Sequence, residues 1–230
     1  MLVSVHMPKT AGLSFRRVLE QAFGAGFRHD YADYPLAATV DERRRRAMRH
    51  ALLAAPGQYA GVDCLHGHFL PLKYLLLADD MPCRFVTWLR EPVARLVSHY
   101  HYWQRAYDPA SGQTSALHRR VVEEAWTLEQ FCLSHQLRNL YTEFLWGLPL
   151  QRLDFVGITE HFDEDLRYFS AVFLGTSTQP PQLNRRPEAP GGALQPALSR
   201  LTLRRIRSFH ARDMALYAAA LALRAQRAPR

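Results

Sequence analysis

The start of the chain places a lysine between an apolar run and a helical pattern. The apolar run covers residues 2–7, Pro8 ends it, and Lys9 follows directly. The small and hydroxyl residues Thr10, Ala11, Gly12 and Ser14 then keep the backbone open. Backbone N–H groups and the positive end of the next helix favour an anion there. The loop is not a Walker A sequence, and an ordinary strand-to-helix turn with a surface lysine is the alternative.

A second candidate pair, Arg90 and Ser98, follows another apolar run. Residues 84–89 predict a buried strand, and Pro92 suits the first turn of the next helix because its missing N–H is not needed there. Ser98 lies eight residues after Arg90. An arginine fork and a hydroxyl can clamp one phosphate, with charge-assisted bonds worth about 1.5–3 kcal/mol. Alternatively, Arg90 pairs with Glu91 or another carboxylate and Ser98 faces a neighbour.

Two histidines, His66 and His68, follow residues 59–65, which predict a short strand. Side chains at i and i+2 of an extended segment share one face, so both imidazoles are expected to face one cleft. An imidazole titrates near neutral pH and is a natural general base for a hydroxyl. Two histidines without a nearby Asp, Glu or Cys make a weak zinc signature, and no metal site is predicted. A purely structural pair is a further alternative.

Strands that alternate with helices must position these residues. Apolar spacing predicts helices over 15–23, 41–55, 71–78, much of 116–147, 163–174 and 198–227, and a further strand over 154–159. This order implies a three-layer α/β domain with a mostly parallel sheet. Ligands bind such sheets at the carboxyl ends of the strands, and Lys9, His66 and Arg90 each follow a predicted strand.

The sequence also predicts the local structure or role of several individual segments. Asp41 is predicted to cap the second helix, and the basic run 43–46 to be a solvated helix face rather than an acceptor-binding patch. Residues 175–196 are rich in Pro, Gly, Ser, Thr and Asn and predict a loop or lid. His99 and His101 are expected to be packing residues. The last helical segment offers these side chains to the core: Leu201, Ile206, Phe209, Met214, Leu216 and Tyr217.

Length and composition fit a globular enzyme of one domain, residues 1–230. Hydrophobic residues at 48% and charged residues at 22% are ordinary values. A net charge of +8 favours anionic ligands without choosing among nucleotide, polysaccharide and nucleic acid. The three cysteines are far apart in the chain, so neither a zinc site nor a disulfide framework is expected.

Targeting signals are not predicted. No Lys or Arg precedes Lys9, and the first apolar run is too short for a signal peptide. Residues 70–78 are too short to span a bilayer and include Lys73. A cytoplasmic location without a transmembrane segment is therefore expected.

Together, the three motifs resemble those of carbohydrate sulfotransferases that use 3′-phosphoadenosine 5′-phosphosulfate (PAPS). The branch with heparan sulfate 2-O-sulfotransferases and bacterial homologues is the most similar. Residues 6–15 look like its 5′-phosphosulfate loop, residues 85–100 like its 3′-phosphate motif, and residues 66–68 like the histidine pair of the 2-O branch. Residues 156–163 and the segment around Asp213 are weaker matches. Leu13 departs from the Thr or Ser usual in that family.

The resemblance implies a P-loop-like sulfotransferase fold that binds PAPS and releases its product PAP. The sulfuryl group would move in line to a hydroxyl of a carbohydrate or glycolipid, with Lys9 stabilising the leaving phosphate oxygen. His68 would take the acceptor proton, with His66 as the supporting or alternative base. No metal is required. The implied cofactor-binding residues are Pro8, Lys9, Thr10, Ala11, Gly12, Leu13, Ser14, Arg90 and Ser98.

Two other functions are weighed against this one. A nucleotide-dependent phosphotransferase would need a magnesium site, but the strands before His66 and Arg90 lead into no acidic residue. A basic nucleic-acid-binding protein would fit the charge, but no helix-turn-helix, OB-fold or RRM signature is present, so no nucleic acid partner is expected. The loops 108–115 and 175–196 are expected to select the acceptor. The sequence does not encode an oligomeric state.

Overall fold

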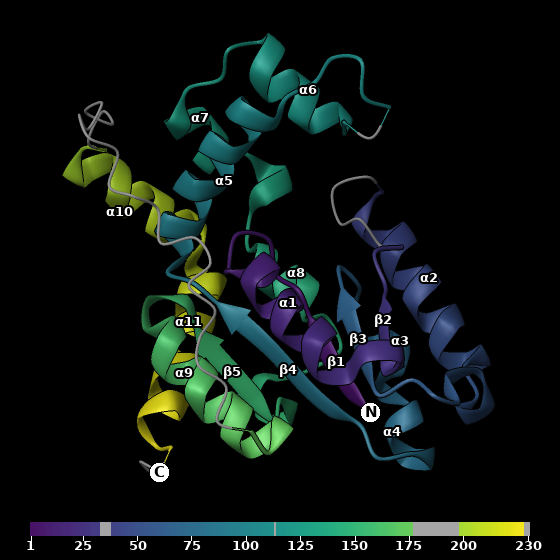
Figure 1. Cartoon of the computed structure of the whole chain (residues 1–230). Helices are drawn as coiled ribbons and strands as arrows, with labels where there is room; N and C mark the ends of the chain where they lie inside the picture. Colours follow the sequence, from purple (N-terminus) through teal and green to yellow (C-terminus); the bar gives the residue numbers. More distant parts are fainter. Residues whose placement is uncertain (33–37, 113, 177–197, 228–230) are drawn as a thin grey trace.

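The computed structural model describes residues 1–32, 38–112, 114–176 and 198–227, and its strands form one parallel sheet (Figure 1). The strand order is β2-β3-β1-β4-β5, with every neighbouring pair parallel. The strands are β1 (Leu2–Val5), β2 (Phe27–His29), β3 (Cys64–Gly67), β4 (Arg84–Leu89) and β5 (Phe155–Ile158). The predicted α/β class with a mostly parallel central sheet is therefore confirmed.

Helices connect the strands and cover both faces of the sheet. Their bounds are α1 (Gly12–Phe23), α2 (Val40–Leu53), α3 (Leu72–Leu75), α4 (Leu77–Asp80), α5 (Pro92–Ala106), α6 (Ala116–Glu123), α7 (Leu128–Cys132), α8 (Leu140–Phe144), α9 (Phe162–Phe169), α10 (Arg200–Phe209) and α11 (Ala211–Ala225).

Neighbouring strand residues point to opposite faces and enter separate cores. Phe85 joins Tyr141 of α8 and Tyr217 of α11 in one core, whereas Val86 joins Phe15 of α1 in the other. This alternation follows from the period of two residues along a strand. The sheet is therefore the middle of three layers, with α1 and α9 packed on one face and α8 and α11 on the other.

A third apolar cluster lies beyond the carboxyl ends of the strands, where α5 extends away from the sheet (Figure 1). Trp103 of α5 packs there with Val121 of α6, Phe131 of α7 and Ile206 of α10. His99 is 4% exposed and contacts the rings of Trp103 and Phe131, so its predicted packing role is confirmed. The cluster supports α5 from its far end.

Several sequence predictions hold at the residue level. β4 covers the predicted residues 84–89, and Pro92 is the first residue of α5. The predicted apolar face of α1 is buried at Phe15, Val18 and Leu19, and Gly24 ends that helix with a φ of 49°.

Other predictions of local structure are wrong. Tyr59 belongs to a 3₁₀ turn that begins at Pro56, and β3 starts only at Cys64. Thr39, not Asp41, caps α2, because the Thr39 hydroxyl accepts from the Glu42 N–H. The three-residue strand β2 was not predicted. Three residues are too few to show the alternation of apolar and polar residues by which a strand is predicted. The strand lies at the edge of the sheet, where it pairs with β3.

The predicted helix over 71–78 is two short helices, α3 and α4, and the predicted C-terminal helix is interrupted at His210. Ile206 and Tyr217 are buried as expected, whereas Leu201 is 68% exposed. Most of the predicted loop 175–196 lies outside the described residues.

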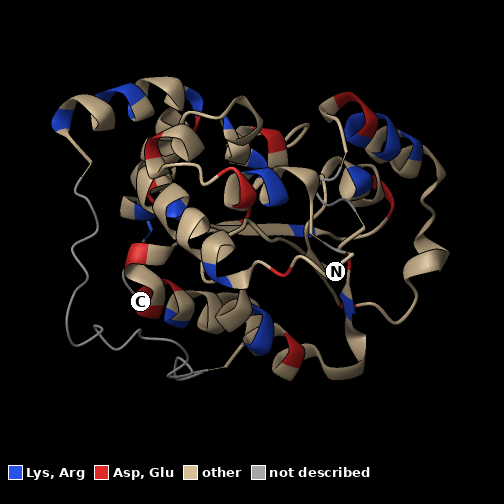
Figure 2. Ribbon diagram, turned by 90° about the horizontal axis from the view of Figure 1, so that it is seen from above, with Lys and Arg blue, Asp and Glu red and all other residues tan. Residues whose placement is uncertain are grey.

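No helix in the described part of the chain is long and apolar enough to cross a membrane. In the view from above, Lys and Arg are spread over several helices together with Asp and Glu (Figure 2).

Candidate functional site

The loop between β1 and α1 is held in an unusual backbone conformation. Lys9 has a φ of 68° and Ala11 a φ of 60°, values that non-glycine residues rarely adopt. Thr10, between them, is fully buried, and its hydroxyl donates to the Met7 carbonyl at 2.9 Å. The Thr10 side chain therefore holds the loop together rather than facing outward. Strained backbone of this kind gathers at ligand-binding positions.

The first turn of α1 presents backbone donors beyond this loop. Ser14 and Phe15 donate their N–H groups to the Ala11 carbonyl, while the N–H groups of Gly12 and Leu13 are the first of the helix and have no intrahelical acceptor. The Leu13 side chain is 58% exposed. These two donors and the positive end of a 12-residue helix favour an anion at this point.

Gly12 also sets how closely the loop approaches His6. A Cβ at Gly12 would lie 1.7 Å from His6 Nε2, so any larger residue would collide with the imidazole. The His6 ring fills this space because its Nδ1 is hydrogen-bonded to the Tyr31 hydroxyl at 3.1 Å. The close approach of Gly12 to the His6 ring therefore fixes the position of the loop relative to that imidazole.

Three imidazoles are stacked at the carboxyl ends of β1 and β3. The His6 ring lies between His66, at 4.9 Å, and His68, at 4.4 Å between ring centroids. Both rings contact His6, as expected for one face, but His66 is 1% exposed, so the prediction that both imidazoles face one cleft is wrong for His66. His6 reaches them because Val5 of β1 pairs with Gly67 of β3, so the residues after both strands are neighbours. Tyr31 contacts all three rings edge-on.

The two predicted base candidates differ in environment. His66 is 1% exposed, and burial lowers its pKa to about 3. Its Nδ1 is hydrogen-bonded to the Ser4 hydroxyl at 2.9 Å. His68 is less buried, and burial also lowers its pKa below the ordinary value. Its Nδ1 lies 2.6 Å from the His6 carbonyl. Because a carbonyl only accepts, Nδ1 carries the proton and Nε2 keeps its lone pair.

Arg90 leaves β4 at the same edge of the sheet, next to β1. Its side chain is partly buried, and no hydrogen bond or ion pair joins its guanidinium to the described residues. The alternative in which Glu91 neutralises it is not observed, since the Glu91 carboxylate instead caps α5 by accepting from the Ala94 N–H at 2.7 Å. The Arg90 guanidinium is therefore not neutralised by a carboxylate of the described residues.

A cation–π contact joins the Lys9 loop to the helix that carries Ser98. Lys9 Nζ lies 4.0 Å from the centre of the Tyr102 ring. Tyr102 is one turn after Ser98 on α5, so the two side chains lie on the same face of the helix. The Lys9 loop and α5 are therefore in contact although they are far apart in the sequence.

Lys9, His68 and Arg90 thus follow three neighbouring strands at the carboxyl edge of the sheet, and Lys9 contacts the helix that carries Ser98. Sequence reasoning gave no separate role to His6, whose position at the start of the loop was the available signal. It also missed Tyr102 and Tyr141, whose contacts depend on how α5 and α8 pack.

The chain was also compared with known proteins. No protein-family model and no curated protein sequence matches it. A crystal structure of a sulfotransferase from Alicyclobacillus acidocaldarius is similar with a TM-score of 0.49 and 16% identity, covering 95% of this chain and 94% of that one. Mouse sulfotransferase SULT7A1 in complex with PAP has a TM-score of 0.38 and 14% identity, covering 93% of this chain and 64% of that one. At this degree of similarity, neither structure assigns an activity to the chain.

Proposed function

We propose that the chain transfers a sulfuryl group from PAPS to a hydroxyl of a carbohydrate or glycolipid acceptor. One observation supports this most strongly: His6, before the Lys9 loop, is stacked on the His68 ring, and Lys9 itself contacts Tyr102 on the helix that carries Ser98. This arrangement supports roles for the loop as an anion site, for His68 as a general base and for Ser98 in a second phosphate clamp. The resemblance of the same residues to sulfotransferase motifs supports the choice of donor.

The residues of this proposed site suit a nucleotide that carries phosphate groups at both the 5′ and the 3′ positions of its ribose. The N–H groups of Gly12 and Leu13 and the Lys9 ammonium would hold the 5′-phosphosulfate. Arg90 and Ser98 would hold the 3′-phosphate, and so distinguish PAPS from nucleotides that lack it. Bound PAPS would supply the activated sulfuryl group. Pro8 and Ala11 shape the loop, and the hydroxyl of Thr10 fixes it.

Lys9 has a further role in the reaction. Negative charge grows on the phosphate oxygen that loses the sulfuryl group, and a positioned ammonium stabilises that charge more in the transition state than in the ground state. The Tyr102 ring holds Lys9 Nζ at the loop before the ligand arrives.

His68 is the base in this proposal. The His6 carbonyl orients its ring, and the low pKa keeps the imidazole neutral near pH 7. Nε2 can therefore accept the proton of the acceptor hydroxyl as the oxygen attacks sulfur. His66 lies behind His6 and is too deeply buried to reach an acceptor, so it supports the stack.

Calorimetric titration with PAP, AMP and ATP tests the proposal. AMP is PAP without its 3′-phosphate, and we expect PAP to bind at least about tenfold more tightly, since one charge-assisted phosphate contact is worth about that factor. Transfer of labelled sulfate from PAPS to a mixture of glycans and glycolipids then tests the reaction. Equal binding of PAP and AMP, or preferred binding of ATP with phosphoryl transfer, would overturn it.

A further inference from the structure

Three of the four hydrogen-bonding groups of His6 are held by neighbouring residues. Its backbone N–H donates to the Gly67 carbonyl at 2.8 Å, and its carbonyl accepts from His68 Nδ1 at 2.6 Å. Nδ1 of its ring is hydrogen-bonded to the Tyr31 hydroxyl at 3.1 Å. The fourth group is Nε2, and no hydrogen bond or ion pair joins it to the described residues. The proposed function leaves this nitrogen without a role.

The glycine that begins α1 shows where Nε2 lies. A Cβ at Gly12 would be 1.7 Å from His6 Nε2. A carbon–carbon single bond is about 1.5 Å long, so Nε2 lies within about 3.2 Å of the Gly12 Cα. The Cα–Cβ bonds of a helix tilt towards its N-terminus, so this space is on the N-terminal side of Gly12. The N–H groups of Gly12 and Leu13, which have no intrahelical acceptor, open on the same side.

The His6 ring is neutral near pH 7. Burial lowers its pKa well below the ordinary value, and the neighbouring histidines and the cations Arg16 and Lys9 add to this effect. A neutral imidazole carries a proton on one ring nitrogen and a lone pair on the other. An anion beside Nε2 is repelled by a lone pair there and attracted by an N–H. A bound anion therefore favours the tautomer with the proton on Nε2.

The Tyr31 hydroxyl suits this tautomer, because a hydroxyl donates as well as accepts. When Nε2 of His6 carries the proton, Nδ1 has the lone pair and accepts from the Tyr31 O–H. The preceding residue, Asp30, anchors this segment through its N–H, which donates to the His66 carbonyl at 3.0 Å. The Asp30 carboxylate also binds Lys73 Nζ at 2.7 Å. The segment after β2 thus holds the Tyr31 hydroxyl at the His6 ring.

We propose that His6 donates its Nε2–H to the anion bound at the start of α1, and that Tyr31 is the positioning residue that holds the tautomer. The identity of this anion, the 5′-phosphosulfate of PAPS, rests on the proposed function. His6 adds an uncharged donor to the N–H groups of α1 and the Lys9 ammonium. A neutral imidazole near a helix N-terminus can donate to negative charge that develops during a reaction.

Two substitutions separate the two ring nitrogens of His6. In His6→Gln the side-chain NH₂ comes close to the place of Nε2 and can still donate to the anion. In His6→Asn the shorter amide extends only as far as Nδ1, so it can bond to Tyr31 but cannot reach the anion.

Calorimetric titration with PAP, 3′-AMP and AMP measures the contact. PAP and 3′-AMP differ in the 5′-phosphate, whereas PAP and AMP differ in the 3′-phosphate. In His6→Asn the ratio of PAP to 3′-AMP affinity should fall about 10- to 100-fold, as for a lost hydrogen bond to a charged group. His6→Gln should keep most of this ratio. The ratio of PAP to AMP affinity should change in neither variant.

Nitrogen-15 NMR of the imidazole reports the tautomer directly. In the PAP complex we expect His6 Nε2 to be protonated and Nδ1 to be the acceptor. Tyr31→Phe keeps the ring and removes the hydroxyl, so it should weaken this tautomer and lower the ratio of PAP to 3′-AMP affinity about fivefold. A proton on Nδ1 in the wild-type complex would overturn the inference.

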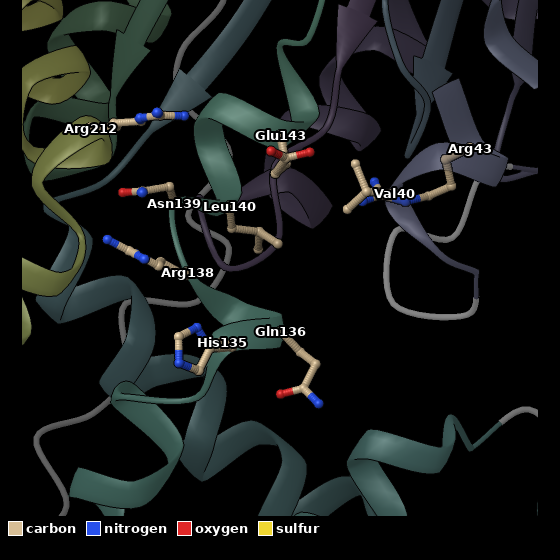
Figure 3. A pocket seen from close by; sticks show the side chains of 9 residues that line it. All are labelled: Val40, Arg43, His135, Gln136, Arg138, Asn139, Leu140, Glu143 and Arg212. Atoms are coloured by element: carbon tan, nitrogen blue, oxygen red, sulfur yellow. The ribbon is translucent and has the colours of Figure 1, made fainter. Parts of the chain in front are cut away.

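His135→Asn is the matched control, because it makes the same change at a histidine away from α1. His135 is exposed and lies on the wall of a cavity of about 330 Å³ between α2, α8 and the start of α11 (Figure 3). This variant should bind all three nucleotides as the wild type does. Thermal unfolding of each variant shows that it is folded.

The inference fails if His6→Asn keeps the wild-type ratio of PAP to 3′-AMP affinity. An equal loss in His6→Gln or in His135→Asn also contradicts it, since the donor at Nε2 would then not be what matters. The proposed function fails separately. A wild-type protein that binds PAP and AMP equally, but loses the 5′-phosphate contribution in His6→Asn, keeps the role of His6 and loses the proposed 3′-phosphate clamp. A protein that binds no PAP contradicts both proposals.

Discussion

The hydroxyl of Tyr141 makes hydrogen bonds with both backbone groups of Arg90. It accepts from the Arg90 N–H at 3.0 Å and donates to the Arg90 carbonyl at 2.8 Å. Tyr141 is fully buried, and burial raises its pKa, so the hydroxyl keeps the proton that it donates. A residue of α8 thus fixes the point at which β4 ends and the Arg90 side chain begins.

Tyr141→Phe removes this hydroxyl while keeping the ring. We expect the free energy of unfolding to fall by about 1–3 kcal/mol, because the Arg90 N–H and carbonyl lose a partner. We also expect PAP to bind more weakly while AMP binding changes little, since only PAP uses Arg90 in the proposed site. Chemical denaturation and calorimetry measure the two effects.

Tyr100→Phe is the matched control for this prediction. The Tyr100 hydroxyl donates to the Trp126 carbonyl at 2.8 Å, away from Arg90. Stability should fall without a change in the ratio of PAP to AMP affinity. A Tyr141→Phe protein with an unchanged ratio would show that the hydroxyl has only a structural role.

Lys9→Ala should lower turnover with PAPS by about 100- to 1000-fold, the usual effect of losing one group that stabilises transition-state charge. PAP binding should weaken much less, because the backbone N–H groups of α1 remain. Steady-state kinetics and PAP titration measure the two quantities. Equal losses in turnover and in PAP affinity would make Lys9 a simple anchor.

The rate of transfer should depend on pH through His68. Only the neutral imidazole can accept a proton, and burial lowers its pKa. The rate should therefore be constant near pH 7 and fall only below the ordinary imidazole value of about 6.5. His68→Gln should remove the activity and leave PAP binding intact. Full activity in this variant would assign the base to another residue.

Stability should depend on pH through the buried His66. The unfolded chain binds a proton there near pH 6.5, whereas the folded chain does so only near a pKa of about 3. The free energy of unfolding is therefore constant above pH 6.5 and decreases as the pH falls towards 3. The contribution of His66 between pH 7 and pH 5 is on the order of 2 kcal/mol. Urea denaturation at each pH, compared with His66→Gln, measures it. Identical pH profiles for both proteins would contradict this assignment.

Sequence patterns predicted most of the parallel sheet and the residues at its carboxyl edge. A six-residue apolar run such as β4 and a proline at the start of α5 are local signals, and both hold. The three-residue strand β2 has no comparable signal, because its pairing with β3 is decided by tertiary packing.

The burial of Arg43 could not be predicted from the sequence. Four consecutive arginines on a helix point in different directions, and what packs against the helix decides which of them is buried. Of the run 43–46, which was predicted to be a solvated helix face, Arg43 is only 4% exposed, and Arg44 pairs with Glu143, a hundred residues after Arg43 in the chain. Likewise, the stacking of His6 on His66 and His68 depends on the register of β1 against β3.

Gly12→Ala tests whether the loop and the histidine stack are coupled. The new Cβ would overlap His6 Nε2, so the imidazole or the first turn of α1 must move. We expect a loss of about 1–3 kcal/mol in stability from overpacking. The change should also alter His68, because the His6 carbonyl orients that ring.

The NMR signals of the His68 ring report this coupling, and turnover with PAPS reports its effect on the reaction. Gly57→Ala is the control, since a Cβ at Gly57 meets no atom within 4 Å. It should leave stability, the His68 signals and turnover unchanged. If Gly12→Ala lowers stability but leaves the His68 signals at their wild-type positions, the stack is set by β1 and β3 alone, and the loop can move without disturbing the base.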